Sequence, residues 1–447
     1  MKTSERTSLL SRLVASVITT VIVTVLNGTS QVAQAAPASQ ERVQRGAYLA
    51  RAGNCIACHT AREGQSFAGG RPMNTPVGLI YSTNVTPDLE TGTGGYTMDD
   101  SMHVMREGVA KDGHYLYPAM PYTSYTKVSQ EDLLALYTYF MQGVEPVRQA
   151  NRPTQLPWPF SMRSIMAVWN ALYLQKGEYV ADQDKSASWN RGAYLVQGLG
   201  HCGACHTPRG IAGQEKAGSE KDGRQYLSGA TLDNWYASPL TGDPETGLHA
   251  WSKNEIVDYL RTGRTARVAA LGVMAEVVGK STQYLTDPDL QAIAEYLKSL
   301  PPVDNERQSN TDSIGQVSDA SATTRALRAG DTGIRGSGVY LDNCNACHRS
   351  DGTGATRTFP NLVKNEAVNA GDPITLIRII VEGTSMPSTD TAPSAIAMPG
   401  LGWRLSDEEV TDVLNFIRGS WGNRAAAVSR GEVGRVRQIL AVQKECR

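Results

Sequence analysis

Apolar residues recur at helical spacing in three similar places along this 447-residue chain. A capping Ser or Thr and acidic residues mark the start of each periodic segment, which predicts closing helices at 130–142, 287–299 and 406–418. Upstream, a Gly-Ala-Tyr-like stretch at 45–49, 191–195 and 338–341 favours a short helix that ends in a Cys-x-x-Cys-His sequence. The chain is therefore predicted to be mainly α-helical, with one unit repeated three times.

Changes in composition mark the joints between the three copies. Prolines punctuate residues 146–159, and Pro301-Pro302 opens a stretch rich in Ser, Asp, Thr and Ala that has the character of a flexible linker. The length suits about three domains of roughly 150 residues each. The expected segments are a signal peptide (1–36), a first repeat (37–145), a connection with an amphipathic helix (146–186), a second repeat (187–302), a flexible linker (303–330), a third repeat (331–420) and a basic amphipathic tail (421–447).

The first residues predict export from the cytoplasm. Basic residues up to Arg12 precede an apolar run at 13–26 and the small-residue stretch 33–36, which are the three parts of a Sec signal peptide. Cleavage is expected after Ala35 or Ala36. No later segment has the apolar length that a spanning helix needs. We therefore expect an exported mature chain without a transmembrane helix.

Three Cys-x-x-Cys-His motifs carry the candidate chemistry. In such a motif the two cysteines form thioethers to the vinyl groups of a haem, and the adjacent imidazole is directed at the iron. A thioredoxin-like redox pair would explain one Cys-x-x-Cys, but not three that are each followed by His. The predicted attachment residues are Cys55, Cys58 and His59, then Cys202, Cys205 and His206, then Cys344, Cys347 and His348. The histidines are the predicted proximal ligands, and the predicted fold is three tandem cytochrome c-like domains with one covalent haem c each.

Each repeat also offers a methionine as the sixth iron ligand. Methionine is the usual partner in electron-carrying c-type cytochromes, because a thioether favours Fe(II). Met120 lies between two prolines before the first closing helix, and Met274 and Met398 occupy corresponding places in the other repeats, with Met386 as the alternative in the third. A lone methionine is usually core filler, but the repeated position favours ligation. Three haem irons with all coordination positions filled would carry electrons and would have no open position for a substrate.

The remaining composition narrows the function further. The net charge is −1, with 43 basic and 44 acidic residues, so no global field draws the chain to nucleic acid. Aromatic residues make up only 7%, and buried porphyrins would supply apolar bulk. His103 and His114 are alternatives to Met120 but are expected at the surface, and His201 is expected to pack locally. The seventh cysteine, Cys446, is expected to be incidental.

Two segments outside the repeats have amphipathic helical patterns. Residues 162–174 are expected to form a helix packed between repeats, with a quinone or membrane contact as the alternative. In the tail, Val433, Val436 and Leu440 share one face of a basic helix within 423–442. That face can pack on the third repeat, or it can dock on a membrane or a partner.

Residues outside the motifs resemble a known family. The stretches 75–88, 108–113, 117–122, 198–210, 281–285 and 420–423 closely resemble the cytochrome c subunit of the membrane-bound dehydrogenases of acetic acid bacteria and relatives. The resemblance covers essentially the whole mature chain. Met274 and Met398 match the family's ligand positions in the second and third domains, although Gly272-Val273-Met274 departs from the usual pair of glycines before the methionine.

The resemblance implies an electron-transfer subunit. It would take electrons from a large dehydrogenase subunit, a quinoprotein, flavoprotein or molybdoprotein, and hand them through its haems to ubiquinone. It would attach peripherally to the periplasmic face of the bacterial inner membrane, and the resemblance allows for a small third subunit. Alcohol, aldehyde, gluconate, sorbitol and fructose dehydrogenases use similar subunits, so the partner stays open. A soluble periplasmic electron shuttle and an autonomous multihaem oxidoreductase are the alternatives.

Overall fold

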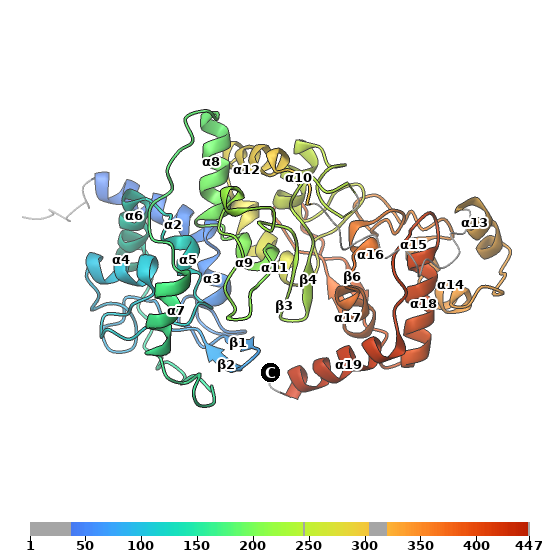
Figure 1. Cartoon of the computed structure of the whole chain (residues 1–447), viewed down its shortest axis with the longest axis horizontal. Coiled ribbons are helices and arrows are strands. Elements are labelled where there is room, and N and C mark those ends of the chain that lie inside the picture. Colours follow the sequence, from blue (N-terminus) through green and yellow to red (C-terminus); the bar gives the residue numbers. More distant parts are fainter. Residues whose placement is uncertain (1–36, 245, 304–319, 446–447) are drawn as a thin grey trace, which may run out of the picture.

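The computed structural model describes residues 37–244, 246–303 and 320–445. The expected signal peptide, most of the expected flexible linker and Cys446 lie outside the described residues. Figure 1 shows that the three repeats follow one another along the long axis of the molecule, with the first in blue and green and the third in orange and red.

Helices dominate the described chain. In chain order they are α2 (Pro37–Ala52), α3 (Cys55–Cys58), α4 (Met98–Glu107), α5 (Tyr122–Tyr125), α6 (Gln130–Gln142), α7 (Ile165–Tyr173), α8 (Ala187–Gln197), α9 (Gly203–His206), η1 (Glu220–Asp222), α10 (Lys253–Thr262), α11 (Gly272–Lys280), η2 (Thr282–Tyr284), α12 (Asp287–Ser299), α13 (Ala320–Arg328), α14 (Ser337–Asn343), α15 (Asn345–His348), α16 (Glu366–Asn369), α17 (Ile374–Glu382), α18 (Asp407–Gly419) and α19 (Arg430–Glu445). Three small antiparallel sheets pair β1 (Pro72–Thr75) with β2 (Gly78–Tyr81), β3 (Ala230–Leu232) with β4 (Trp235–Ala237), and β5 (Gly383–Ser385) with β6 (Ala397–Pro399).

The three closing helices form where the sequence predicts them. α6 and α12 have the predicted bounds, and α18 begins one residue later than predicted because Ser406 is its N-cap. Ser129, Thr286 and Ser406 each accept a hydrogen bond from the backbone N–H three residues further on. These bonds satisfy backbone donors that would otherwise lack a partner at the helix start.

Each closing helix is crossed closely by the helix that leads into the motif. The distance from an added Cβ to the nearest carbonyl oxygen is 2.0 Å at Gly46 (Ala135), 2.0 Å at Gly192 (Ala292) and 2.1 Å at Gly336 (Asp412). Only a residue without a side chain allows this approach. In the third repeat, the glycine at the crossing is therefore Gly336. The Gly-Ala-Tyr-like pattern instead aligns Gly338, two residues later, with Gly46 and Gly192.

The prediction that each motif lies at the C-terminal end of its leading helix is wrong. Each motif lies on its own one-turn helix: α3, α9 or α15. Before the first and second motifs the chain breaks at Asn54 (φ 50°) and His201 (φ 35°), which adopt the left-handed conformation. Such a residue cannot continue a right-handed helix, so the motif turn takes a new direction.

Three apolar clusters form the core, one per repeat. The first lies around α2 and α6, the second around α8 and α12, and the third around α14, α17 and α18. The third cluster extends beyond the expected repeat at both ends, because it includes Leu327 of α13 and the α19 residues Val433, Val436 and Leu440. The apolar face of the tail is therefore buried in the protein, and it is not available for docking on a membrane or partner.

The predicted helix in the first connection is present as α7 and contacts both neighbouring repeats. Asn170 donates to the Glu107 carbonyl and accepts from the Tyr122 hydroxyl, both in the first repeat. The Trp169 indole donates to the Ala212 carbonyl of the second repeat at 2.9 Å. Over the described ranges, we find no helix with the length and apolar character needed to cross a bilayer.

The crossing at Gly192 gives a stability prediction. Alanine normally favours a helix over glycine by about 1 kcal/mol, but a methyl group here would collide with the Ala292 carbonyl. We expect Gly192→Ala to destabilise the protein by about 1–3 kcal/mol, as overpacking does. Urea unfolding measures the change. Gly371→Ala is the control, because an added Cβ there has no atom within 4 Å; equal stability of the two variants would contradict the close crossing.

Candidate haem sites

All three Cys-x-x-Cys-His motifs line one connected cavity of about 1830 Å³. The lining is mostly apolar and aromatic, and it includes segments of every repeat. A large apolar cavity with a few convergent polar groups is the usual form of a cofactor site. The cavity therefore brings together sequence positions that lie far apart in the chain.

The three motif histidines are oriented alike. The ring Nδ1 lies within hydrogen-bonding distance of a backbone carbonyl in each repeat: 2.8 Å from Thr83 O for His59, 2.7 Å from Ser238 O for His206 and 3.0 Å from Pro360 O for His348. Burial lowers the pKa of each histidine, against the opposing effect of the carbonyl. A neutral ring that donates through Nδ1 leaves the Nε2 lone pair free, which is the arrangement typical of iron-bound histidine. These residues fit a haem iron.

The motif cysteines have the character of attachment residues and not of redox thiols. Burial raises the pKa of the Cys55, Cys202 and Cys344 thiols to about 12, and that of Cys205 to about 11. A reactive cysteine of the thioredoxin type has a lowered pKa. The six motif cysteines are free in the described chain, so each remains available for a thioether.

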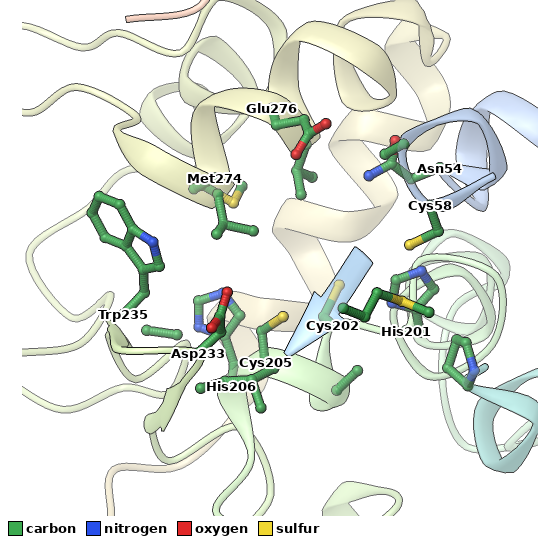
Figure 2. Close-up of a pocket in the computed structure, with 18 of the residues that line it drawn as sticks. Asn54, Cys58, His201, Cys202, Cys205, His206, Asp233, Trp235, Met274 and Glu276 are labelled. Atoms are coloured by element: carbon green, nitrogen blue, oxygen red, sulfur yellow. The ribbon is translucent and has the colours of Figure 1, made fainter. Parts of the chain in front are cut away.

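The predicted methionine ligands of the first two repeats line the same cavity. Met120 packs against the first apolar cluster. Met274 lies in the first turn of α11, and Figure 2 shows it across the pocket from the His206 ring, with Cys205 beside that ring. The positions suit a histidine and a methionine on opposite sides of one group.

Both candidate methionines of the third repeat reach the cavity. Met398 on β6 pairs with Thr384 on β5, and Met386 follows two residues after Thr384. The backbone N–H of Met386 donates to the Ile396 carbonyl at 2.9 Å, so the pairing continues one residue past β5. Side chains two apart in such a pairing share a face, which puts Met386 and Met398 on one side of the hairpin. Met386 is 6% exposed, and its neighbour Pro387 packs against Gly263 of the second repeat. Met386 therefore lies at a contact between repeats.

The histidines outside the motifs are placed differently from one another. His103 is exposed, and His114 is half-buried beside Asp112. His201 packs its ring edge-on against Tyr125 of the first repeat, with the ring centroids 5.7 Å apart. The His201 ring therefore packs across the contact between the first two repeats.

An ion pair that the sequence analysis missed joins the first motif to the second repeat. The Arg71 guanidinium binds both carboxylate oxygens of Glu276, with Nη2 at 2.7 Å from Oε2, and also donates to the Ala57 carbonyl inside the first motif. Glu276 lies on α11, two residues after Met274 (Figure 2). Neither residue belongs to a motif, and an Arg and a Glu 205 positions apart carry no pairing signal in one sequence.

The second and third repeats meet through a different set of contacts. The Arg378 guanidinium lies 4.4 Å from the centroid of the Trp235 ring. The backbone N–H of Gly272, at the start of α11, donates to the Thr384 hydroxyl at 3.3 Å. Buried Arg264 donates to carbonyl groups in the loop that follows Met386. The helix with Met274 and the hairpin with Met398 are therefore directly connected.

Comparison with known proteins agrees with this geometry. Residues 334–421 match the family model described as cytochrome c. The chain is 48% identical over 413 residues to the gluconate 2-dehydrogenase cytochrome c subunit of Pantoea cypripedii, covering 91% of this chain and 92% of that protein. It is 45% identical to the cytochrome c subunit of the quinone alcohol dehydrogenase of Gluconobacter oxydans (91% and 84%) and 38% identical to the fructose dehydrogenase cytochrome subunit of Gluconobacter japonicus (95% and 89%).

The helical fold, the motif geometry and the matched segment define a c-type cytochrome, with covalently attached haem c. Such a protein has a role in electron transfer. The chain belongs to the family of cytochrome c subunits of gluconate 2-, quinone alcohol and fructose dehydrogenases. This membership confirms the resemblance carried by the residues outside the motifs.

The Arg71–Glu276 pair gives a second prediction. Both side chains are largely shielded, with 33% and 25% of their surface exposed. We expect Arg71→Gln and Glu276→Gln each to destabilise the protein, and the double variant to cost less than their sum by about 1–2 kcal/mol. Glu276→Gln leaves the Arg71 charge without its carboxylate, and Arg71→Gln leaves Glu276 with Lys280 as its remaining cationic partner at 2.7 Å. Urea unfolding of all four proteins measures this coupling.

A matched surface pair supplies the control. Arg148 and Glu90 also form an ion pair, but 73% and 61% of these side chains is exposed. Their coupling is expected to stay below about 0.5 kcal/mol because water and salt screen it. Equal coupling in the two pairs would contradict a specific role for Arg71 at the first motif.

Proposed function

We propose that this chain is a three-haem cytochrome c subunit that carries electrons from a periplasmic dehydrogenase subunit to ubiquinone and helps to attach the complex to the inner membrane. The observation that supports it most strongly is the single cavity lined by three Cys-x-x-Cys-His motifs and by a methionine from each repeat. The relatives are named as cytochrome subunits of dehydrogenases, which supports electron transfer from a dehydrogenase partner to this chain.

The proposed architecture is three cytochrome c domains at 37–145, 187–302 and 331–420, with the described part of the tail, 421–445, packed on the third. A haem c bound in each domain supplies reversible one-electron Fe(III)/Fe(II) chemistry. His59, His206 and His348 would each supply an imidazole ligand to one iron, and Met120, Met274 and Met398 would each supply a thioether ligand. The apolar lining excludes water, and the backbone carbonyls hold each imidazole in the required tautomer. Met386 lies at the contact between the second and third repeats, whereas Met398 packs against the third apolar cluster, and these positions favour Met398 as the third ligand.

The proposal includes export and attachment to the membrane surface. Residues 1–36 have the pattern of a signal peptide, which would direct the chain to the periplasm. The first connection exposes several large apolar side chains, with exposed fractions of 80% for Trp158, 62% for Val168 and 68% for Leu172. α7 has nine residues, about 14 Å at 1.5 Å per residue, so it would lie in the bilayer surface instead of crossing it.

Iron ligation by methionine has a direct test. Ferric haem with a Met ligand has a weak charge-transfer absorbance at the red end of the spectrum, and the pyridine haemochrome assay counts haem. We expect three haems per chain, and a loss of about a third of the red absorbance in each of Met120→Leu, Met274→Leu and Met398→Leu, because each removes one thioether ligand. Met386→Leu is the control of similar volume and is expected to keep the full absorbance.

The outcomes separate the alternatives. Loss of the absorbance in Met386→Leu but not in Met398→Leu would reassign the third ligand. A wild-type iron without any methionine signature would favour an autonomous multihaem oxidoreductase. A haem content below three would contradict the proposal.

Membrane attachment is tested on the exposed face of α7. We expect Val168→Gln with Leu172→Gln to weaken binding to vesicles of phosphatidylethanolamine and phosphatidylglycerol by about 30- to 150-fold, because each side chain loses roughly 1–1.5 kcal/mol of apolar transfer. Vesicle flotation of the holoprotein measures binding. Trp403→Gln is the control, because Trp403 is 85% exposed but lies in the third repeat. Unchanged flotation of the double variant would favour the soluble shuttle.

A further inference from the structure

Two tyrosines exchange hydrogen bonds between the first and second repeats. The Tyr48 hydroxyl, on α2, donates to Asp289 Oδ2 of α12 at 2.5 Å. The Tyr194 hydroxyl, on α8, donates to Asp132 Oδ2 of α6 at 2.6 Å. Each tyrosine comes from the Gly-Ala-Tyr stretch of one repeat and binds the closing helix of the other, so the contact is reciprocal.

Each tyrosine also accepts a hydrogen bond at the start of the helix that it reaches. The backbone N–H of the N-cap residue donates to it, Thr286 to the Tyr48 hydroxyl at 3.3 Å and Ser129 to the Tyr194 hydroxyl at 3.2 Å. An intervening water is unnecessary at these distances. The tyrosine therefore completes the cap of a helix in the neighbouring repeat.

Each aspartate is shared between the two repeats. Asp289 also receives two hydrogen bonds from Arg191 of its own repeat, both at 2.8 Å. Asp132 likewise receives a hydrogen bond from Arg45 of its own repeat at 2.8 Å. Both carboxylates are largely buried, with 10% and 3% of the side chain exposed. Hydrogen bonds to a buried carboxylate are among the strongest in proteins, so these contacts define a fixed geometry.

Each of the first two repeats also contributes an apolar residue to the core cluster of the other. Ala52, at the end of α2, belongs to the second apolar cluster, and Leu199, just after α8, belongs to the first. A contact in which residue i of one unit meets j of the other, and the reverse also holds, is the signature of twofold symmetry. The first two repeats therefore pack as a pseudo-twofold pair.

The pairing contact is close to the attachment sites. α2 is followed after one residue by the left-handed Asn54, and α8 after three residues by the left-handed His201, and these two residues directly precede the first and second motifs. Figure 2 shows Cys58 of the first motif facing Cys202 and His201 of the second repeat. Fixing the two helices against each other thus fixes the separation of the two motif turns.

The third repeat lacks this contact. The residue two positions after its crossing glycine is Gly338, where the other repeats have Tyr48 and Tyr194. Its own tyrosine, Tyr340, donates instead to the Arg349 carbonyl within the same repeat at 2.7 Å and packs against Phe416 and Trp421.

We propose that Tyr48 and Tyr194 are positioning residues that hold the first two haem-attachment sites as one rigid pseudo-twofold pair, to which the third site is joined without this constraint. The inference rests on the proposed function, because it assumes that both motifs carry haem. It assigns a share of the fixed mutual orientation of these two sites, beside the Arg71–Glu276 ion pair, to two hydroxyl groups outside every motif.

Circular dichroism in the Soret region tests the pairing on the full-length holoprotein. Two haems in a fixed mutual orientation give a bisignate couplet, whose amplitude depends on that orientation. We expect the amplitude to fall by about half in Tyr48→Phe and in Tyr194→Phe, and further in the double variant, because the ring is kept but the charge-assisted hydrogen bond is lost. The red-end methionine absorbance is expected to stay unchanged, which a general loss of structure would not allow.

Tyr340→Phe is the matched control. It also removes a buried tyrosine hydroxyl bond, so thermal stability should fall, but the couplet should keep its wild-type amplitude. If the tyrosine variants are produced poorly, Asp289→Asn tests the same contact, because it retains an acceptor for Tyr48 while losing the charge. It is expected to reduce the couplet to a smaller extent.

Three results would overturn the pairing: no couplet in the wild type, an unchanged couplet in both tyrosine variants, or an equal loss in Tyr340→Phe. A haem count separates this failure from failure of the proposed function. Three haems with an unchanged couplet contradict only the pairing, whereas fewer than three haems contradict the proposed function itself.

Discussion

The close crossing of two helices organises every repeat of this protein. At Gly46, Gly192 and Gly336 a leading segment approaches the carbonyl oxygens of the closing helix so closely that no side chain fits between them. The crossing determines the direction in which the leading helix ends, and the motif turn follows directly. The cavity, the histidine orientation and the contacts between repeats all depend on where that turn lies. A glycine that would weaken an isolated helix is therefore necessary here.

The cavity combines two kinds of constraint. Covalent chemistry needs cysteines and histidine in one tight turn, and those residues are local in sequence. The groups that orient the histidines are not local, since Thr83, Ser238 and Pro360 contribute backbone carbonyls from loops further along the chain. The methionines come from still later segments. Each repeat thus closes a long loop around an apolar space, and a bound haem would fill that space and replace the missing aromatic core.

The two contacts between repeats differ in their physical basis. The first and second repeats share buried aspartates through reciprocal tyrosines, and Arg71 connects a motif to the helix that carries Met274. The second and third repeats meet through Arg378 over Trp235, and through hydrogen bonds to a hydroxyl and to loop carbonyls. The contact between the first two repeats is symmetric, and the contact between the second and third is not. Three similar repeats therefore form one symmetric pair with the third repeat attached to it in a different way.

The sequence by itself determined the local features: the motifs, the N-caps Ser129, Thr286 and Ser406, the closing helices and the repeated methionines, because short-range spacing and capping are readable from neighbouring residues. Only the tertiary structure decided the rest. The left-handed breaks at Asn54 and His201, the burial of the α19 face, and the partners of Tyr48, Arg71 and Met386 depend on residues far away in the chain. One sequence holds no signal for such pairs, since their geometry arises only when the repeats pack together.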